Sequence, residues 1–88
     1  MISVEKTTSG LVVTGNTRLS SIILTAGSDA ASVAVDDSSD GSGSVLATLK
    51  AAANTTEIFT ITQPGVKAAT GLYATLTGTS PKAYVIYR

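Results

Sequence analysis

Hydrophobic and polar residues alternate along much of the chain, most regularly between Ala31 and Ala51. The odd positions hold Ala31, Val33 and Val35, and the even positions between them hold Ser32 and Ala34. A period of two predicts strands, because successive strand side chains point to opposite faces of a sheet. Further along, the odd positions are Val45, Ala47, Leu49 and Ala51, and the even positions are Leu46, Thr48 and Lys50. The residues between the two strands, 36–43, are only Asp, Ser and Gly, so the segment is predicted to be a β-hairpin with a polar tip.

Turn residues recur about every 8 to 12 positions, the spacing of an all-β sandwich or barrel. We predict a small antiparallel β-sandwich that occupies 1–88 as a single domain. The expected strands are 2–6, 10–14, 18–25, 31–35, 44–51, 55–62, 66–68, 72–77 and 83–87. Residues 51–53, all alanine, are predicted to be a strand end or one turn, because three residues cannot nucleate a helix.

Two segments are apolar on both faces. Ile22-Ile23-Leu24 and Leu11-Val12-Val13 place large side chains at successive positions, which is typical of strands covered on both sides. A second subunit or a loop folded over the strand would each provide that cover. The chain has 88 residues with one Phe, three Tyr and no Trp or Cys, so its core is thin and no disulfide supports it. Oligomerisation is therefore the expected support.

The overall charge separates this chain from nucleic-acid-binding proteins. Six basic and six acidic residues cancel to a net charge of zero, so the positive footprint that attracts phosphate backbones is missing. No apolar run approaches the roughly 20 residues of a transmembrane helix, or the length of a signal peptide at the start. We expect a protein made in the cytoplasm, without direct nucleic-acid or membrane partners.

Groups for catalysis are scarce. The chain has no His and no Cys, and it contains no Gly-x-Ser-x-Gly elbow or phosphate-binding Gly-Lys-Thr/Ser motif. Glu5 and Glu57 fall on separate predicted strands and are not expected to form a catalytic carboxylate pair. The sequence predicts that the protein is not an enzyme and carries no cofactor.

One pattern is typical of metal binding. Asp36-x-Ser38-x-Asp40-Gly41 matches the start of a calcium loop, in which oxygen ligands alternate and a glycine turns the chain. The twelfth position is Ala47 instead of a bidentate Glu, and strands flank the loop instead of helices. We therefore favour a polar hairpin tip whose side chains bond their own turn, with calcium as the alternative.

The last predicted strand has two distinct faces. Tyr84 and Ile86 share one, and Ala83, Val85 and Tyr87 share the other. One face is expected to be core, and the other to pack at an interface or stack on a sugar, with packing favoured.

Several of these segments together resemble small virion proteins of tailed bacteriophages. In that family a strand leads into a D-x-x-x-x-G hairpin, here starting at Asp36, and a G-L-Y-x-x-L-x-G strand follows, here starting at Gly71. The chain then closes on an aromatic final strand, here Ala83-Tyr-Val-Ile-Tyr, so that the resemblance covers about 10–87. It implies a jelly-roll-like sandwich that decorates a capsid or forms part of a fibre or head-tail structure, commonly as a homotrimer.

The combined expectation is a virion structural protein, a capsid decoration or cement protein that contacts the major capsid protein or other virion proteins. The alternatives are a receptor- or glycan-binding knob at a fibre tip and a calcium-stabilised adhesin-like module. The residues predicted to contact other subunits are Leu11, Val13, Ile22, Leu24, Tyr84 and Ile86.

Overall fold

The computed structural model describes residues 2–61 and 65–88, and these residues form strands and turns without a helix. Its strands, in chain order, are β1 (Ile2–Lys6), β2 (Gly10–Thr14), β3 (Thr17–Thr25), β4 (Ala31–Asp37), β5 (Ser44–Ala51), β6 (Thr56–Thr60), β7 (Val66–Ala68), β8 (Gly71–Thr77) and β9 (Lys82–Tyr87). The predicted strands are all present, with ends that differ by a few residues. Thr62, the last residue of the predicted strand 55–62, lies outside the described residues.

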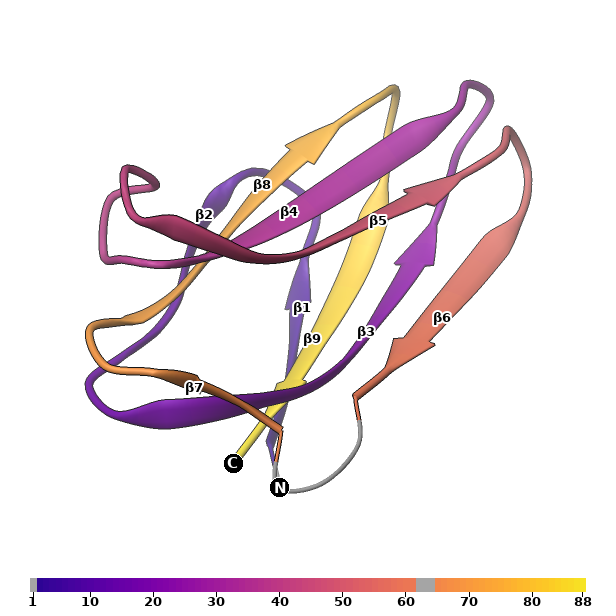
Figure 1. Cartoon of the computed structure of the whole chain (residues 1–88). Coiled ribbons are helices and arrows are strands. Elements are labelled where there is room, and N and C mark those ends of the chain that lie inside the picture. The colour runs from indigo at the N-terminus through magenta and orange to yellow at the C-terminus, as the bar shows by residue number, and fades with distance from the viewer. Residues whose placement is uncertain (1, 62–64) are drawn as a thin grey trace.

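The strands form two antiparallel sheets that pack face to face (Figure 1). Sheet A has the order β1-β9-β3-β6, with β7 also paired to β3, and sheet B has the order β2-β8-β4-β5. The pairs β4–β5, β3–β6, β2–β8 and β1–β9 are nested inside one another, as if one long hairpin had been rolled up. This is the arrangement of a jelly roll. The predicted fold class, an all-β sandwich of jelly-roll type, is confirmed.

The core lies between the two sheets and is built from alternate residues of the central strands. The largest fully buried side chains are Leu19, Ile22, Leu24, Val33, Val35, Leu72 and Val85. Alanines at strand positions fill most of the remaining core. On β9, Ala83, Val85 and Tyr87 are buried, so the face opposite Tyr84 is the core face. Within the described residues, no helix could cross a membrane.

Strand β3 contains an irregularity that determines which of its side chains point inward. Its pairing with β9 shifts register between Leu19 and Ser21, so Ser20 is an extra residue in the strand. Beyond this bulge, Ile22 and Leu24 enter the core and are fully buried. Their predicted role as contact residues is therefore corrected, because neither side chain reaches the surface of the chain. Ile23 points to the outer face instead.

A second bulge changes the predicted hairpin. The β4–β5 pairing shifts register between Val35 and Asp36, which face Ala47 and Val45 respectively, so Leu46 is the extra residue. Leu46 packs against the core, whereas Val45 is 58% exposed. The predicted alternation of β5 holds for Ala47, Leu49 and Ala51 but is wrong at Val45.

Candidate functional site

The outer face of sheet A carries an apolar cluster formed by residues from three neighbouring strands. Ile23 on β3 lies directly opposite Tyr84 on β9 and Ile58 on β6. Ile86 follows Tyr84 at the next outward position of β9. Residues directly opposite each other in a sheet point to the same side. We call the set Ile23, Ile58, Tyr84 and Ile86 the outer apolar face. Ile58 is 65% exposed, so this face is open to contact from outside the chain.

A hydrogen bond between neighbouring strands fixes the Tyr84 side chain at the edge of this face. It donates a hydrogen bond to Glu5 Oε2 on β1 at 2.8 Å, and Glu5 is the cross-strand partner of Tyr84. The bond and the negative charge of Glu5 raise the pKa of the Tyr84 phenol, because both favour its neutral form. The phenol ring is therefore oriented by a carboxylate, and Glu5 has a structural role.

Strand β6 adjoins the outer apolar face, and among the described residues it pairs only with β3, so one of its backbone edges has no strand beside it. Ala26 N–H donates to Thr55 C=O and Ile61 N–H donates to Ser20 C=O, both at 2.9 Å. Hydrogen-bonded pairs alternate in an antiparallel ladder, so the backbone groups of Glu57 and Phe59 also point to β3. Those of Thr56, Ile58 and Thr60 point away from it. All five residues of β6 are exposed, and none is Pro or Lys, the residues that commonly protect an edge.

The structure separates the residues predicted to make contacts. Tyr84 and Ile86 are half-buried and share the outer apolar face. Leu11, 41% exposed, and Val13, half-buried against the core, lie on β2 in the other sheet. The predicted contact residues did not include Ile23 and Ile58, which belong to the outer apolar face. The sequence contains a sign that Ile23 points outward. Ser21 and Thr25, two positions before and after it, are polar, and residues two apart in a strand lie on the same face.

The acidic loop, residues 36–43, is fixed to another part of the chain by Asp37. Its Oδ1 accepts a hydrogen bond from the backbone N–H of Thr70 at 2.8 Å, and Oδ2 accepts one from Ala69 N–H at 3.1 Å. These bonds, with a longer one from Gly71 N–H, lower the pKa of Asp37 because they favour the ionised carboxylate. Asp37 thus joins the β4–β5 hairpin to the turn between β7 and β8, a role that the sequence pattern did not indicate.

Within the loop, Ser38 and Asp40 bond to the turn itself. Ser38 Oγ accepts a hydrogen bond from Gly41 N–H at 2.8 Å, and Asp40 Oδ1 accepts one from Ser42 N–H at 3.0 Å. Gly43 has no room for a side chain, since an added Cβ would lie 2.0 Å from Asp37 O. These contacts agree with the predicted turn-shaping role. In the described residues, no cluster of three His, Cys, Asp or Glu side chains suits a metal ion.

Asp36 differs from its neighbours because it is buried. Its side chain is 5% exposed, and it lies opposite Tyr73 of β8 in the register of sheet B. Gly41 rests on the Tyr73 ring, where an added Cβ would be 3.0 Å from the ring. Burial raises the pKa of Asp36, since an ionised carboxylate loses its hydration there. Asp36, the first residue of the D-x-x-x-x-G segment, and Tyr73 of the G-L-Y segment thus lie side by side in the folded chain.

Three of the acidic side chains near these surfaces already have partners within the chain. Asp37 and Asp40 accept backbone hydrogen bonds, and Glu5 accepts one from the Tyr84 hydroxyl. No family model matches the chain, and neither the curated proteins nor the solved structures contain a match to it.

Proposed function

We propose that this protein is a structural component of a tailed-phage virion, and specifically a capsid decoration or cement protein. It is made in the host cytoplasm and assembles on the particle, where it bridges neighbouring subunits of the major capsid protein. Homotrimers are the assembly unit in this proposal. Direct contact with nucleic acid or membrane plays no part in it.

The observation that carries the proposal is the meeting of the two sequence motifs within a jelly roll. The D-x-x-x-x-G segment forms the tip of the β4–β5 hairpin, and the G-L-Y segment is β8, which pairs with β4. Asp36 and Tyr73 are cross-strand partners, and Gly41 packs on the Tyr73 ring. The residues that carry the resemblance are therefore structurally coupled, which supports a shared architecture. Jelly rolls also occur in viral capsid proteins, although fold alone does not establish function.

The surface of sheet A supports a mechanical role. The outer apolar face and the free edge of β6 are contiguous, because Ile58 belongs to both. A neighbouring subunit could bury the apolar side chains and pair with the backbone groups of Thr56, Ile58 and Thr60. Such contacts would add apolar burial and hydrogen bonds between subunits, and together they would oppose the outward pressure of a packaged genome.

Protein stoichiometry in the purified particle tests this proposal. Quantitative mass spectrometry against the major capsid protein should give on the order of hundreds of copies per particle, as expected for a protein that follows the capsid symmetry. A count in the tens would instead favour a receptor- or glycan-binding knob at a fibre tip. Absence from the particle would reject a virion role.

Light scattering of the purified protein tests the assembly unit and its surface. We expect a trimer, and we expect Ile58→Lys to dissociate it because a charge would then lie in a desolvated contact. Thr75→Lys is the matched control, since Thr75 is exposed on sheet B. A wild-type monomer at micromolar concentration would reject oligomerisation. A trimer that survives Ile58→Lys would show that its contacts lie elsewhere.

A further inference from the structure

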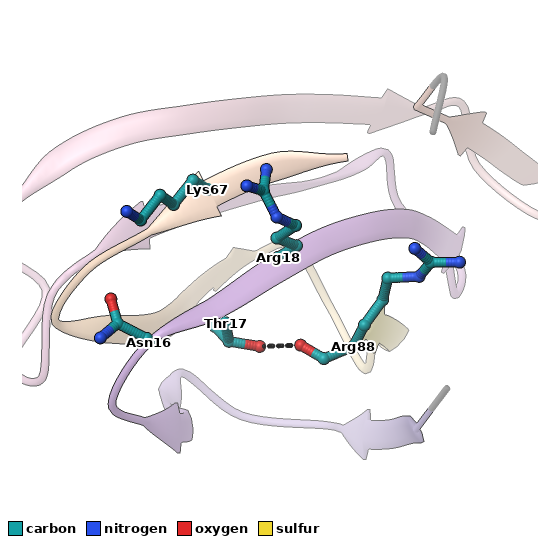
Figure 2. A pocket seen from close by; sticks show the side chains of 5 residues that line it. All are labelled: Asn16, Thr17, Arg18, Lys67 and Arg88. Carbon is teal, nitrogen blue, oxygen red and sulfur yellow. Dashed lines mark hydrogen bonds between the residues drawn. The ribbon is translucent and has the colours of Figure 1, made fainter. Parts of the chain in front are cut away.

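Three basic residues form a row across adjacent strands at one end of sheet A. Arg18 on β3 is the direct cross-strand partner of Lys67 on β7. On its other side, Arg18 exchanges two backbone hydrogen bonds with Arg88, which follows β9: Arg88 N–H donates to Arg18 C=O at 2.9 Å, and Arg18 N–H donates to Arg88 C=O at 3.2 Å. Figure 2 shows Arg18 between the other two residues. We call Lys67, Arg18 and Arg88 the basic row.

The basic row points outward. The next residues along the same strands, Leu19 and Tyr87, are buried in the core, and they are partners of each other. Because strand side chains alternate, Arg18 and its two partners must lie on the opposite side of the sheet. Arg18 is half-buried, whereas Lys67 and Arg88 are exposed. Half of the six basic residues of a chain with zero net charge are thus gathered in one place.

This arrangement is unfavourable in the absence of a ligand. Like charges directly opposite each other destabilise a pair of strands, and here the middle residue has a like-charged neighbour on both sides. In the register, the partners of Arg18 are Lys67 and Arg88, so no carboxylate side chain is interleaved with the row. Cross-strand neutralisation, the simplest structural role for such residues, does not apply.

The basic row borders a surface hollow with further polar groups. The hollow has a volume of about 260 Å³, and its lining consists of the basic row together with Asn16 and Thr17. Thr17 Oγ1 donates a hydrogen bond to Arg88 C=O at 2.6 Å, visible as the dashed line in Figure 2. Thr17 is therefore a positioning residue that holds the chain at Arg88 beside β3. The Asn16 side-chain amide adds a neutral donor at the rim.

We propose that the basic row and its hollow form a binding site for a phosphate group, either free or carried by a small molecule. Arginine presents a fork of N–H donors, and lysine presents a compact charge. The donors come from β3, β7 and the residue after β9. A tetrahedral anion has enough oxygen atoms to accept from all three, whereas a single arginine fork already satisfies a planar carboxylate. The binding of a multivalent oxyanion would also remove the repulsion within the row. This site goes beyond the proposed virion role and does not depend on it.

The test compares phosphate with chloride in thermal unfolding at equal ionic strength and neutral pH, with inorganic phosphate and pyrophosphate as probes. We expect a saturable rise in the Tm of the wild type with either probe. Titration should also shift the backbone amide NMR signals of Arg18 and Lys67. Arg18→Gln and Lys67→Gln should each weaken the apparent affinity about tenfold, as expected for the loss of one charge-assisted contact.

Two features of this experiment separate a site from general charge effects. In chloride alone, Arg18→Gln should melt at a higher temperature than the wild type, because repulsion in the row is relieved. Lys50→Gln and Lys82→Gln, which remove single positive charges on β5 and β9, should keep the phosphate response. Equal effects of phosphate and chloride, or loss of the response in the control variants, would overturn the proposal. A single-stranded oligonucleotide serves as a third probe, and a response to it alone would overturn the proposal in favour of a nucleic-acid site.

Discussion

The carboxylate of Asp37 accepts the backbone N–H of Thr70 at 2.8 Å, across 33 positions of sequence. Asp37 is the last residue of β4, and Thr70 lies in the turn that leads into β8. The bond therefore fixes the end of the acidic hairpin to the turn between two strands that belong to different sheets. Ala69 N–H bonds to the other carboxylate oxygen, so both oxygens of Asp37 are used.

Asp37→Asn should lower the Tm at neutral pH. An amide keeps one acceptor oxygen, but its NH2 group would face a backbone N–H, and the charge would be lost. Because the folded pKa of Asp37 is lowered, its contribution is complete above the ordinary Asp pKa and disappears as the pH falls through the folded pKa. The gap between the two melting curves should therefore narrow below about pH 4. Asp40→Asn, which affects bonds only within the loop, should cause a smaller loss of Tm at neutral pH. Equal losses for the two variants would contradict the anchoring role.

Asp36→Asn should raise the Tm at neutral pH. Burial raises the pKa of Asp36, so its ionised form costs stability at neutral pH, and this cost disappears as the pH falls below the folded pKa towards the ordinary value. We expect the variant to melt above the wild type at pH 7 and to converge with it in acid. A scan of Tm against pH checks this. A lower Tm for the variant at pH 7 would show that the carboxylate is stabilised by contacts that outweigh its burial.

Ile22 and Ile23 provide a matched pair for testing the orientation of β3. Ile22→Ala should cost about 2–5 kcal/mol of unfolding free energy, the usual range for a truncated core side chain. Ile23→Ala should cost less than about 1 kcal/mol in the dissociated chain, because its side chain lies on the outer face. Urea unfolding at low protein concentration measures both. Similar costs for the two variants would place the bulge in β3 elsewhere.

Ser20→Ala should stabilise the fold. Among the described residues, Ser20 Oγ is the buried side-chain polar atom without a hydrogen-bond partner. Its removal should gain about 1 kcal/mol, because an unpartnered hydroxyl is costly to bury. Thr17→Val is the control with the opposite sign, since it removes the hydrogen bond to Arg88 C=O. Urea unfolding of both variants measures these changes, and a stability loss in Ser20→Ala would indicate a partner such as buried water.

Calcium should leave the Tm unchanged. Ser38 and Asp40 already bond to the turn, and Asp37 bonds to Ala69 and Thr70, so these oxygen atoms already have partners within the protein. If the loop did bind calcium, a hundredfold excess over the Kd would add about 2.7 kcal/mol. Thermal unfolding with millimolar calcium and with chelator distinguishes the two cases. A rise that Asp40→Asn abolishes would favour the calcium-stabilised adhesin-like alternative.

The alternation in the sequence was sufficient to predict strands, because a period of two reflects the geometry of a single strand. It located the nine strands that the described residues form, and the polar tip between β4 and β5. It also separated the two faces of β9, where Ala83, Val85 and Tyr87 are buried. The absence of His and Cys likewise depends on composition alone.

The two bulges could not be predicted in this way. An extra residue at Ser20 or Leu46 changes which face of the sheet the following side chains occupy. The position of the extra residue depends on the pairing with a distant strand. Ile22 and Leu24 were predicted to be contact residues because the run 22–24 is apolar on both faces, whereas the structure places both side chains in the core. One inserted residue moves every later side chain to the opposite face.

The basic row and the Asp37 anchor also depend on pairing between distant segments. Arg18, Lys67 and Arg88 are scattered in the sequence, and only the pairing of β3 with β7 and with the end of β9 aligns them. The sequence by itself determined which segments are strands and which side-chain types the chain lacks. The tertiary structure decided which side chains meet, because cross-strand register is set by the packing of the whole sandwich.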